Sequence, residues 1–300
     1  MMGSTSLYEK SNSDFLDEAA VEILAPAKLN LLLKITGQRT DGYHELLSVL
    51  VPVDLYDKLK ISKLKEGLEV YWSGRELPET EDNLVHRAAV RFFERSGIRG
   101  GARITVIKEI PISSGLGGGS SDAGATLKGL NQLWGNPLSR GDMEELALGL
   151  GADVPFFLLQ RPSIATGVGE ILQPIEDFPL FWYVIVSPNL MVSTAWAYKR
   201  FKLKLTDNCN QSKIKNLKKC IFNIPDLLSN DLESVTLSRY PFLCSIKASL
   251  IKLGALGALM TGSGPSLFGL FDSAQKAHEA GAAMIRLWQD GEVFVVKGLS

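Results

Sequence analysis

The chain of 300 residues lacks any long hydrophobic run. Its apolar runs, of which Phe181–Val186 is typical, fall far short of the ~20 residues that a membrane-spanning helix needs. The first 20 residues also lack the apolar core of a signal peptide and the arginine-rich, acid-poor character of a transit peptide. These absences predict a cytoplasmic protein with no membrane partner.

An excess of either charge is also missing, and cysteine is scarce. The 32 Lys and Arg residues against 33 Asp and Glu residues give a formal net charge of −1. A nucleic-acid-binding protein usually carries a broad basic surface, so no nucleic-acid partner is expected. Cys209, Cys220 and Cys244 are odd in number and form no CxxC pair, which predicts reduced thiols. None of these features indicates an oligomeric state.

The composition is otherwise that of a folded protein with about two domains, since hydrophobic residues make up 45% and charged residues 22%. Strand-like and helix-like segments are mixed without a strict βαβ repeat, which predicts an α+β fold in two lobes. We expect a loose extension over residues 1–20, an N-terminal lobe over 21–174 and a C-terminal lobe over 175–300.

Hydrophobic periodicity predicts the main elements. Between Ile23 and Ile35 apolar and polar residues alternate, which indicates a strand with one buried face and with Lys28 and Asn30 on its polar face. Further strands are expected over Leu46–Val53, Lys58–Leu64, Gly67–Trp72, Ala102–Ile110, Phe181–Val186, Ser266–Phe271 and Glu292–Lys297. Helices are expected over Asp82–Ser96, Ser120–Trp134, Ser193–Phe201, Arg239–Leu253 and Ala274–Trp288, with another that starts at Ser139 and ends at Gly151.

The richest motif is a glycine loop, residues 111–121, with the sequence PISSGLGGGSS between a predicted strand and a predicted helix. Glycines let the backbone approach an anion closely, and the unpaired N–H groups of the helix start attract phosphate. Ser120 and Ser121 add hydroxyl groups that can donate to phosphate or face a metal ion. A solvent-exposed structural loop is the alternative, but it leaves the Ser-Ser helix start unexplained.

Other nucleotide-binding motifs do not fit this loop. No Gly-Lys pair occurs in the chain, so it is no Walker A loop. The third glycine of a dinucleotide-binding GxGxxG would fall on Ser120. The HRD and DFG motifs of protein kinases are absent.

Three further features are weak by themselves. Lys28 on a strand and Asp153 after a helix are usually a solvated lysine and a loop carboxylate, and their spacing alone cannot pair them. A second small-residue loop, residues 261–266, precedes a predicted strand and indicates only a close backbone approach.

Taken together, five segments resemble the superfamily of galactokinase, homoserine kinase, mevalonate kinase and phosphomevalonate kinase. More narrowly, they resemble the 4-diphosphocytidyl-2-C-methyl-D-erythritol kinases of non-mevalonate isoprenoid (terpenoid) biosynthesis. One departure is visible, because Ser113 stands where the family loop usually has its first glycine. The segments that carry the resemblance are APAKLNL at 25–31, GQRTDGYH at 37–44, the loop at 111–121, GADVP at 151–155 and TGSG at 261–264.

The resemblance implies an N-terminal lobe like ribosomal protein S5 domain 2, a ferredoxin-like C-terminal lobe and an active site in the cleft between them. It implies an enzyme, an ATP-dependent phosphotransferase with an alcohol group as acceptor, which phosphorylates the 2-hydroxyl of 4-diphosphocytidyl-2-C-methyl-D-erythritol. ATP with Mg²⁺ and a cytidine diphosphate methylerythritol are the implied ligands.

The resemblance also assigns residues. Asp153 is implied as the base that orients and deprotonates the attacking hydroxyl, and Lys28 as the neighbouring cation. The substrate would be bound by Asn30, Tyr43 and His44, with Tyr198 as the second aromatic of the cytosine pocket. Ser120 or Ser121 would touch the Mg²⁺ of Mg-ATP. The implied ATP-binding residues are Pro111, Ile112, Ser113, Ser114, Gly115, Leu116, Gly117, Gly118, Gly119, Ser120 and Ser121.

Two alternatives remain. Another kinase of the same superfamily, acting on homoserine or mevalonate, would keep the glycine loop but need no cytosine pocket. A non-catalytic ATP-binding module would have no need of both Lys28 and Asp153.

Overall fold

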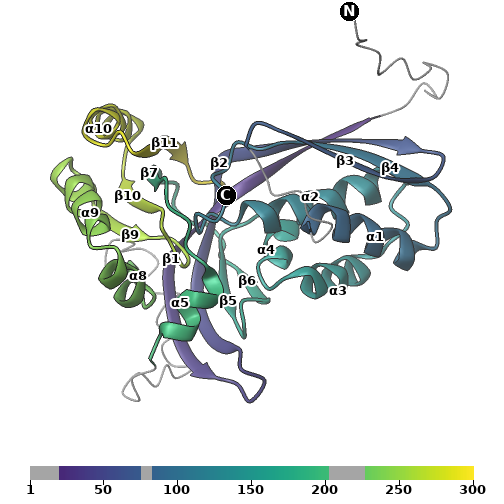
Figure 1. The fold of residues 1–300 in the computed structure, drawn as a ribbon, viewed down its shortest axis with the longest axis horizontal. Coiled ribbons are helices and arrows are strands. Elements are labelled where there is room, and N and C mark those ends of the chain that lie inside the picture. The colour runs from purple at the N-terminus through teal and green to yellow at the C-terminus, as the bar shows by residue number, and fades with distance from the viewer. Residues whose placement is uncertain (1–19, 76–82, 203–226) are drawn as a thin grey trace, which may run out of the picture.

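The computed structural model describes residues 20–75, 83–202 and 227–300, and within them it shows two β-sheets with helices packed on them (Figure 1). Most of the predicted N-terminal extension lies outside the described residues, as do Cys209 and Cys220. Cys244 is a free, exposed thiol. No helix in the described ranges is long and apolar enough to cross a membrane.

The first sheet has seven strands, mostly from the N-terminal half of the chain. Its main path runs β3-β4-β2-β1-β8, with β5 on β2 and β6 on β5. The strands are β1 (Val21–Gln38), β2 (His44–Leu64), β3 (Gly67–Ser73), β4 (Gly101–Ile107), β5 (Ser163–Thr166), β6 (Ile171–Pro174) and β8 (Ser229–Asn230). The helices that follow these strands in the N-terminal half are α1 (Leu84–Ser96), α2 (Gly118–Leu133), α3 (Arg140–Leu150) and α4 (Val154–Leu159).

The second sheet has four antiparallel strands in the order β11-β7-β10-β9. Helices α9 and α10 lie on its outer side (Figure 1). Its strands are β7 (Trp182–Pro188), β9 (Gly257–Met260), β10 (Leu267–Phe271) and β11 (Gly291–Lys297). The helices of this half are α5 (Thr194–Arg200), α8 (Glu233–Arg239), α9 (Phe242–Lys252) and α10 (Ala274–Leu287).

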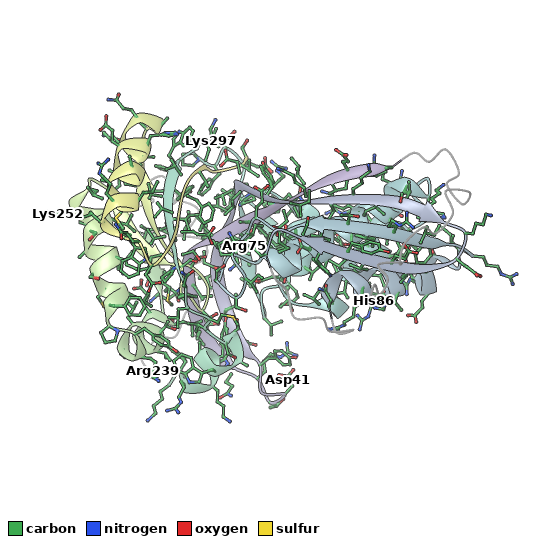
Figure 2. The ribbon with its side chains drawn as sticks, turned by 45° about the horizontal axis from the view of Figure 1, so that its top comes forward. Asp41, Arg75, His86, Arg239, Lys252 and Lys297 are labelled. Atoms are coloured by element: carbon green, nitrogen blue, oxygen red, sulfur yellow. The ribbon has the colours of Figure 1, made fainter. Side chains whose placement is uncertain are left out.

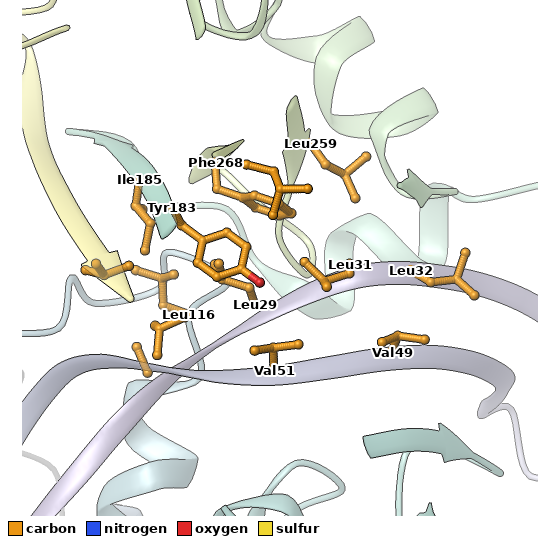
Figure 3. Packing of buried hydrophobic residues seen from close by; sticks show 14 of the residues in the cluster. Leu29, Leu31, Leu32, Val49, Val51, Leu116, Tyr183, Ile185, Leu259 and Phe268 are labelled. Carbon is orange, nitrogen blue, oxygen red and sulfur yellow. The ribbon is translucent and has the colours of Figure 1, made fainter. Parts of the chain in front are cut away.

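A continuous hydrophobic core joins the two sheets. Leu29 and Leu31 of β1 pack in one cluster with Tyr183 of β7 and Phe268 of β10 (Figure 3). Removing such side chains from water stabilises the fold by about 25 cal/mol per Å² of apolar surface. The predicted apolar face of β1 therefore forms the contact between the two halves of the molecule.

An ion pair bridges the same two sheets. Arg75, directly after β3, donates from Nη1 and Nη2 to the carboxylate of Glu292 on β11, at 2.5 and 2.7 Å. Its guanidinium also donates to the carbonyl of Glu109, at 3.0 and 2.7 Å. Figure 2 shows Arg75 where the two halves meet.

The helices expected over Asp82–Ser96 and from Ser139 to Gly151 form as α1 and α3. Asn83 caps α1, whose C-terminal Gly97 is left-handed with φ 66°. Ser139 and Asp142 form a capping box at the start of α3.

Other predictions are wrong in an informative way. The segments expected before and after Val53 are one 21-residue strand, β2. The helix expected over Arg239–Leu253 starts later, at Phe242 (α9), and Arg239 instead ends the preceding helix α8, because Pro241 has no N–H to continue a helix at this point. The polar face of β1 is not solvated, since Lys28 and Asn30 are 4% and 5% exposed.

Candidate active site

A cleft of about 1230 Å³ is lined by both halves of the chain. The predicted residues Lys28, Tyr43, His44, Asp153 and Tyr198 all line it. Most of the glycine loop lines the same cleft, together with Gly262 and Ser263 of the second small-residue loop. The structure thus brings together segments that lie more than 200 residues apart.

The glycine loop leads into a helix start with no side-chain cap. Gly117 is the N-cap residue of α2, with φ 76°, and no side chain satisfies the first N–H groups of the helix. These donors and the positive end of the helix dipole attract phosphate oxygens. A Cβ on Gly117 would lie 2.8 Å from the ring of Phe157, and one on Gly115 would lie 2.2 Å from the carbonyl oxygen of Thr261. The loop therefore needs glycine at both positions.

The serines of the loop have different environments. Ser113 has φ 51°, so the left-handed backbone expected of a glycine is kept by a serine. Ser120 lines the cleft. Ser121 is buried and donates to the carbonyl of Pro26 at 2.7 Å, and of the two serines only Ser120 lines the cleft. Leu116 is buried in the core and is not among the residues that line the cleft.

Lys28 lies beneath this loop. Its backbone N–H donates to the carbonyl of Leu116 at 2.9 Å, and its Nζ donates to Oδ1 of Asn30. Burial lowers the pKa of the Lys28 ammonium, and the negative charge of Asp153 opposes that shift. The lysine and the aspartate therefore act on each other electrostatically within the cleft.

Asp153 occupies the N-cap position of α4, and its carboxylate makes no capping hydrogen bond. The side chain is half-buried and lines the cleft. A carboxylate that does not cap its own helix can accept a proton from a bound hydroxyl. The turn after α3 thus places a carboxylate in the cleft that the start of α2 also lines.

The side chain of Asn30 bonds to two neighbouring side chains. Its Nδ2 donates to Oγ of Ser48 at 2.9 Å, and its Oδ1 accepts from Lys28. The side chain is therefore mainly engaged with other protein groups, although Asn30 does line the cleft. Donation by Asn30 to a substrate remains a prediction.

The other end of the cleft is aromatic. The rings of His44 and Tyr198 lie 5.5 Å apart, and Tyr43, which precedes His44 in the chain, is 64% exposed. The N–H of Tyr43 donates to Oδ1 of Asp41 at 3.1 Å, and this bond lowers the pKa of that carboxyl. Figure 2 shows Asp41 at the tip of the β1–β2 hairpin. The hairpin therefore carries Tyr43 and His44 into the lining of the cleft.

Sequence reasoning missed one cluster of buried charges at the cleft. Lys108 donates to Asp122 on α2 at 2.6 Å and also to Asp57 on β2. Asp57 accepts the N–H groups of Glu109 and Ile110 at 2.6 and 2.9 Å. Burial raises the pKa of the Asp122 carboxyl to about 8, with Asp57 adding to the shift and Lys108 opposing it. Only the position of Asp122 directly after Ser120-Ser121 could have drawn attention to this cluster.

Comparison with known proteins agrees with this geometry. Residues 83–161 match the model of the GHMP kinases N terminal domain, and residues 205–290 match that of the GHMP kinases C terminal. A homoserine kinase structure from Cytophaga hutchinsonii, 21% identical, covers 98% of this chain and 97% of its own with a TM-score of 0.72. At that identity it shows the fold alone. The two family models and the two-lobed α+β fold define a GHMP-type kinase.

The more similar relatives narrow the assignment. A 4-diphosphocytidyl-2-C-methyl-D-erythritol kinase of Syntrophotalea carbinolica is 45% identical over 258 residues, 86% of this chain and 91% of that protein. The crystal structure of a 4-(cytidine 5'-diphospho)-2C-methyl-D-erythritol kinase is 35% identical, covers 93% of this chain and 100% of its own, and has a TM-score of 0.78. The chain belongs to the 4-diphosphocytidyl-2-C-methyl-D-erythritol kinase family. The expectations of fold, kinase activity and ATP as phosphoryl donor are thereby confirmed.

Proposed function

We propose that this chain transfers the γ-phosphoryl group of ATP to the 2-hydroxyl of 4-diphosphocytidyl-2-C-methyl-D-erythritol, with Asp153 as base and Lys28 as its cationic neighbour. The observation that carries the proposal is that both side chains line the cleft into which the uncapped start of α2 opens. A binding module would not need a buried lysine and a free carboxylate together at that point.

The roles of the residues follow from what phosphoryl transfer requires. The transition state spreads negative charge over the phosphoryl oxygens, so positioning and charge neutralisation supply most of the catalysis. Backbone N–H groups of Gly118 and Gly119 hold the phosphates at the start of α2. Asp153 takes the proton of the attacking hydroxyl, the oxygen attacks the γ-phosphorus and ADP leaves. Lys28 neutralises charge beside both groups.

The donor set also fits Mg²⁺. This ion prefers oxygen ligands and is usually held by one or two protein groups together with substrate phosphates. Ser120 lines the cleft directly after Gly118 and Gly119 in the first turn of α2, so its hydroxyl suits that role, whereas the hydroxyl of Ser121 donates to Pro26. When bound, the ion neutralises charge on the phosphate oxygens.

The aromatic end of the cleft supports the choice of a cytidine substrate. Tyr43, His44 and Tyr198 can enclose a flat base, and stacking on an aromatic ring contributes about 1–3 kcal/mol per base. Homoserine and mevalonate have no such ring, so a kinase for either would gain nothing from this surface.

The test is phosphoryl transfer from ATP to a panel of 4-diphosphocytidyl-2-C-methyl-D-erythritol, mevalonate and homoserine. We expect turnover of the cytidine compound only. The control is Asp153→Asn, which keeps the shape and should lower kcat by about 10²–10⁴-fold while ATP still binds. Turnover of mevalonate or homoserine, or near-full kcat in the variant, would overturn the proposal.

A further inference from the structure

A hydrogen-bonded network joins the second small-residue loop to Lys28. The hydroxyl of Thr261 accepts the backbone N–H of Asn30 at 3.1 Å. It also lies 3.4 Å from Oδ1 of Asn30 and 3.4 Å from the carbonyl of Gly115, to either of which it can donate. Thr261 is fully buried, so water cannot replace these bonds. One hydroxyl of the C-terminal half thus contacts both β1 and the glycine loop.

The orientation of the Asn30 amide is fixed by its neighbours. Lys28 has only donors, so the amide oxygen must face it. Ser48 gives its own proton to the carbonyl of Leu32 at 2.6 Å, so its oxygen must accept from Nδ2 of Asn30. Because both ends of the amide are hydrogen-bonded, Oδ1 of Asn30 holds the Lys28 ammonium in one position.

The loop that carries Thr261 is itself held in place. Asn230 on β8 donates from Nδ2 to the carbonyls of Met260 and Gly262, at 2.7 and 2.8 Å. A Cβ on Gly262 would lie 3.3 Å from Nζ of Lys28, so the loop also closes over the ammonium. The loop therefore contacts Lys28 directly at Gly262 and through Asn30 at Thr261.

We propose that Thr261 is a positioning residue for phosphoryl transfer: its hydroxyl fixes Asn30, and Asn30 fixes the ammonium of Lys28 beside the reacting groups. This inference rests on the proposed function, because it gives Lys28 the catalytic role assigned above. Under this inference the C-terminal half lines the cleft and also determines the position of a catalytic side chain. Misplacing a catalytic group by about 1 Å can cost up to a hundredfold in rate.

The test compares two isosteric substitutions. Thr261→Val removes the hydroxyl that contacts Asn30. Thr236→Val is the matched control, because the buried Thr236 on α8 donates to the carbonyl of Ser263 in the same loop, at 3.1 Å, and has no bond to Asn30 or Lys28. We expect Thr261→Val to lower kcat by between about tenfold and a hundredfold with little change in either KM. Thr236→Val should keep kcat, and Thr261→Ser should restore most of it.

A second comparison shows whether Thr261 acts through Asn30. In an Asn30→Ala background, Thr261→Val should lower kcat no further, since the group through which it acts is gone. Thermal unfolding of every variant identifies any that fail to fold. If Thr261→Val does, the kcat of Asn30→Ala is the test, because that variant removes the group through which Thr261 acts on Lys28 and should lower kcat. Equal kcat in Thr261→Val and the wild type, or equal losses in Thr261→Val and Thr236→Val, would overturn the inference. Absence of turnover in the wild type would instead contradict the proposed function.

Discussion

The ring of Tyr198, on α5, lies 5.5 Å from the ring of His44, at the start of β2, with 35° between the two planes. Residues 154 positions apart therefore form one aromatic wall of the cleft, and Asp153 acts electrostatically on the same tyrosine. The aromatic wall and Asp153 therefore belong to the same cleft.

Replacing the exposed Tyr43 with alanine tests whether the cleft binds the cytosine base of the substrate. Tyr43→Ala should raise KM for the cytidine substrate by roughly ten- to a hundredfold, because it removes ~1–3 kcal/mol of stacking. KM for ATP should change little. Steady-state kinetics measures both, with Tyr71→Ala as the control, since Tyr71 is 52% exposed on β3 and does not line the cleft. Equal changes for ATP and the cytidine substrate would indicate a general disturbance of the fold instead.

A side chain at Gly117 should abolish the phosphate site. In Gly117→Val the Cβ would approach the ring of Phe157 to 2.8 Å and Cγ of Lys28 to 3.0 Å, at φ 76°. The left-handed backbone alone costs roughly 1–2 kcal/mol for a residue with a Cβ, so ATP affinity should fall by at least about tenfold. Calorimetry measures the affinity. Gly135→Val is the matched control, because Gly135 has φ 77° with no atom within 4 Å, and unchanged ATP binding in Gly117→Val alone would move the nucleotide site elsewhere.

Ser113 offers a stabilising substitution within the loop. A serine at φ 51° carries a steric cost that glycine avoids, of roughly 1–2 kcal/mol, partly offset by the greater chain entropy of glycine. Ser113→Gly should therefore raise the free energy of unfolding by up to about 1 kcal/mol in urea denaturation. Ser62→Gly, within the extended strand β2, should lower it by roughly 0.5–1 kcal/mol. A loss of stability in Ser113→Gly would show that the serine side chain itself stabilises the loop.

Asp122 should make stability fall as the pH rises. Burial raises the pKa of its carboxyl to about 8 in the folded chain, above the ordinary value of about 3.9 that holds in the unfolded chain. Between these values the unfolded chain has lost the proton that the folded chain keeps, so this contribution to stability is complete below pH ~4 and is lost by pH ~8. The slope is up to about 1.4 kcal/mol per pH unit.

Asp122→Asn removes the titrating group and keeps an oxygen for Lys108. Urea denaturation at pH 5 and pH 8 should show a smaller loss of stability in the variant than in the wild type. An identical pH dependence in the two proteins would mean that Asp122 is ionised throughout, which its burial and the nearby charge of Asp57 oppose.

Much of the site followed from the sequence because its signals are local. A glycine run between a strand and a helix indicates a phosphate loop, since φ and backbone N–H direction depend on neighbouring residues only. The capping box of Ser139 and the left-handed Gly97 are local in the same sense. Resemblance added Lys28, Asp153 and the aromatic residues, which the structure places in one cleft.

The tertiary structure decided what lies against each strand face. Alternation on β1 marks one apolar face, but residues far along the chain determine whether the other face meets water. Here Thr261 and the glycine loop cover that face, so Lys28 and Asn30 are buried and hydrogen-bonded to each other. Likewise, the association of Lys108 with Asp57 and Asp122 depends on how β2, β4 and α2 pack. The periodicity of one segment cannot encode a contact among side chains from three different segments. The sequence by itself determined the backbone conformation of the glycine loop. Only the packing of the two halves buries Lys28 and orients its ammonium, because burial and hydrogen bonding arise from contacts between distant segments.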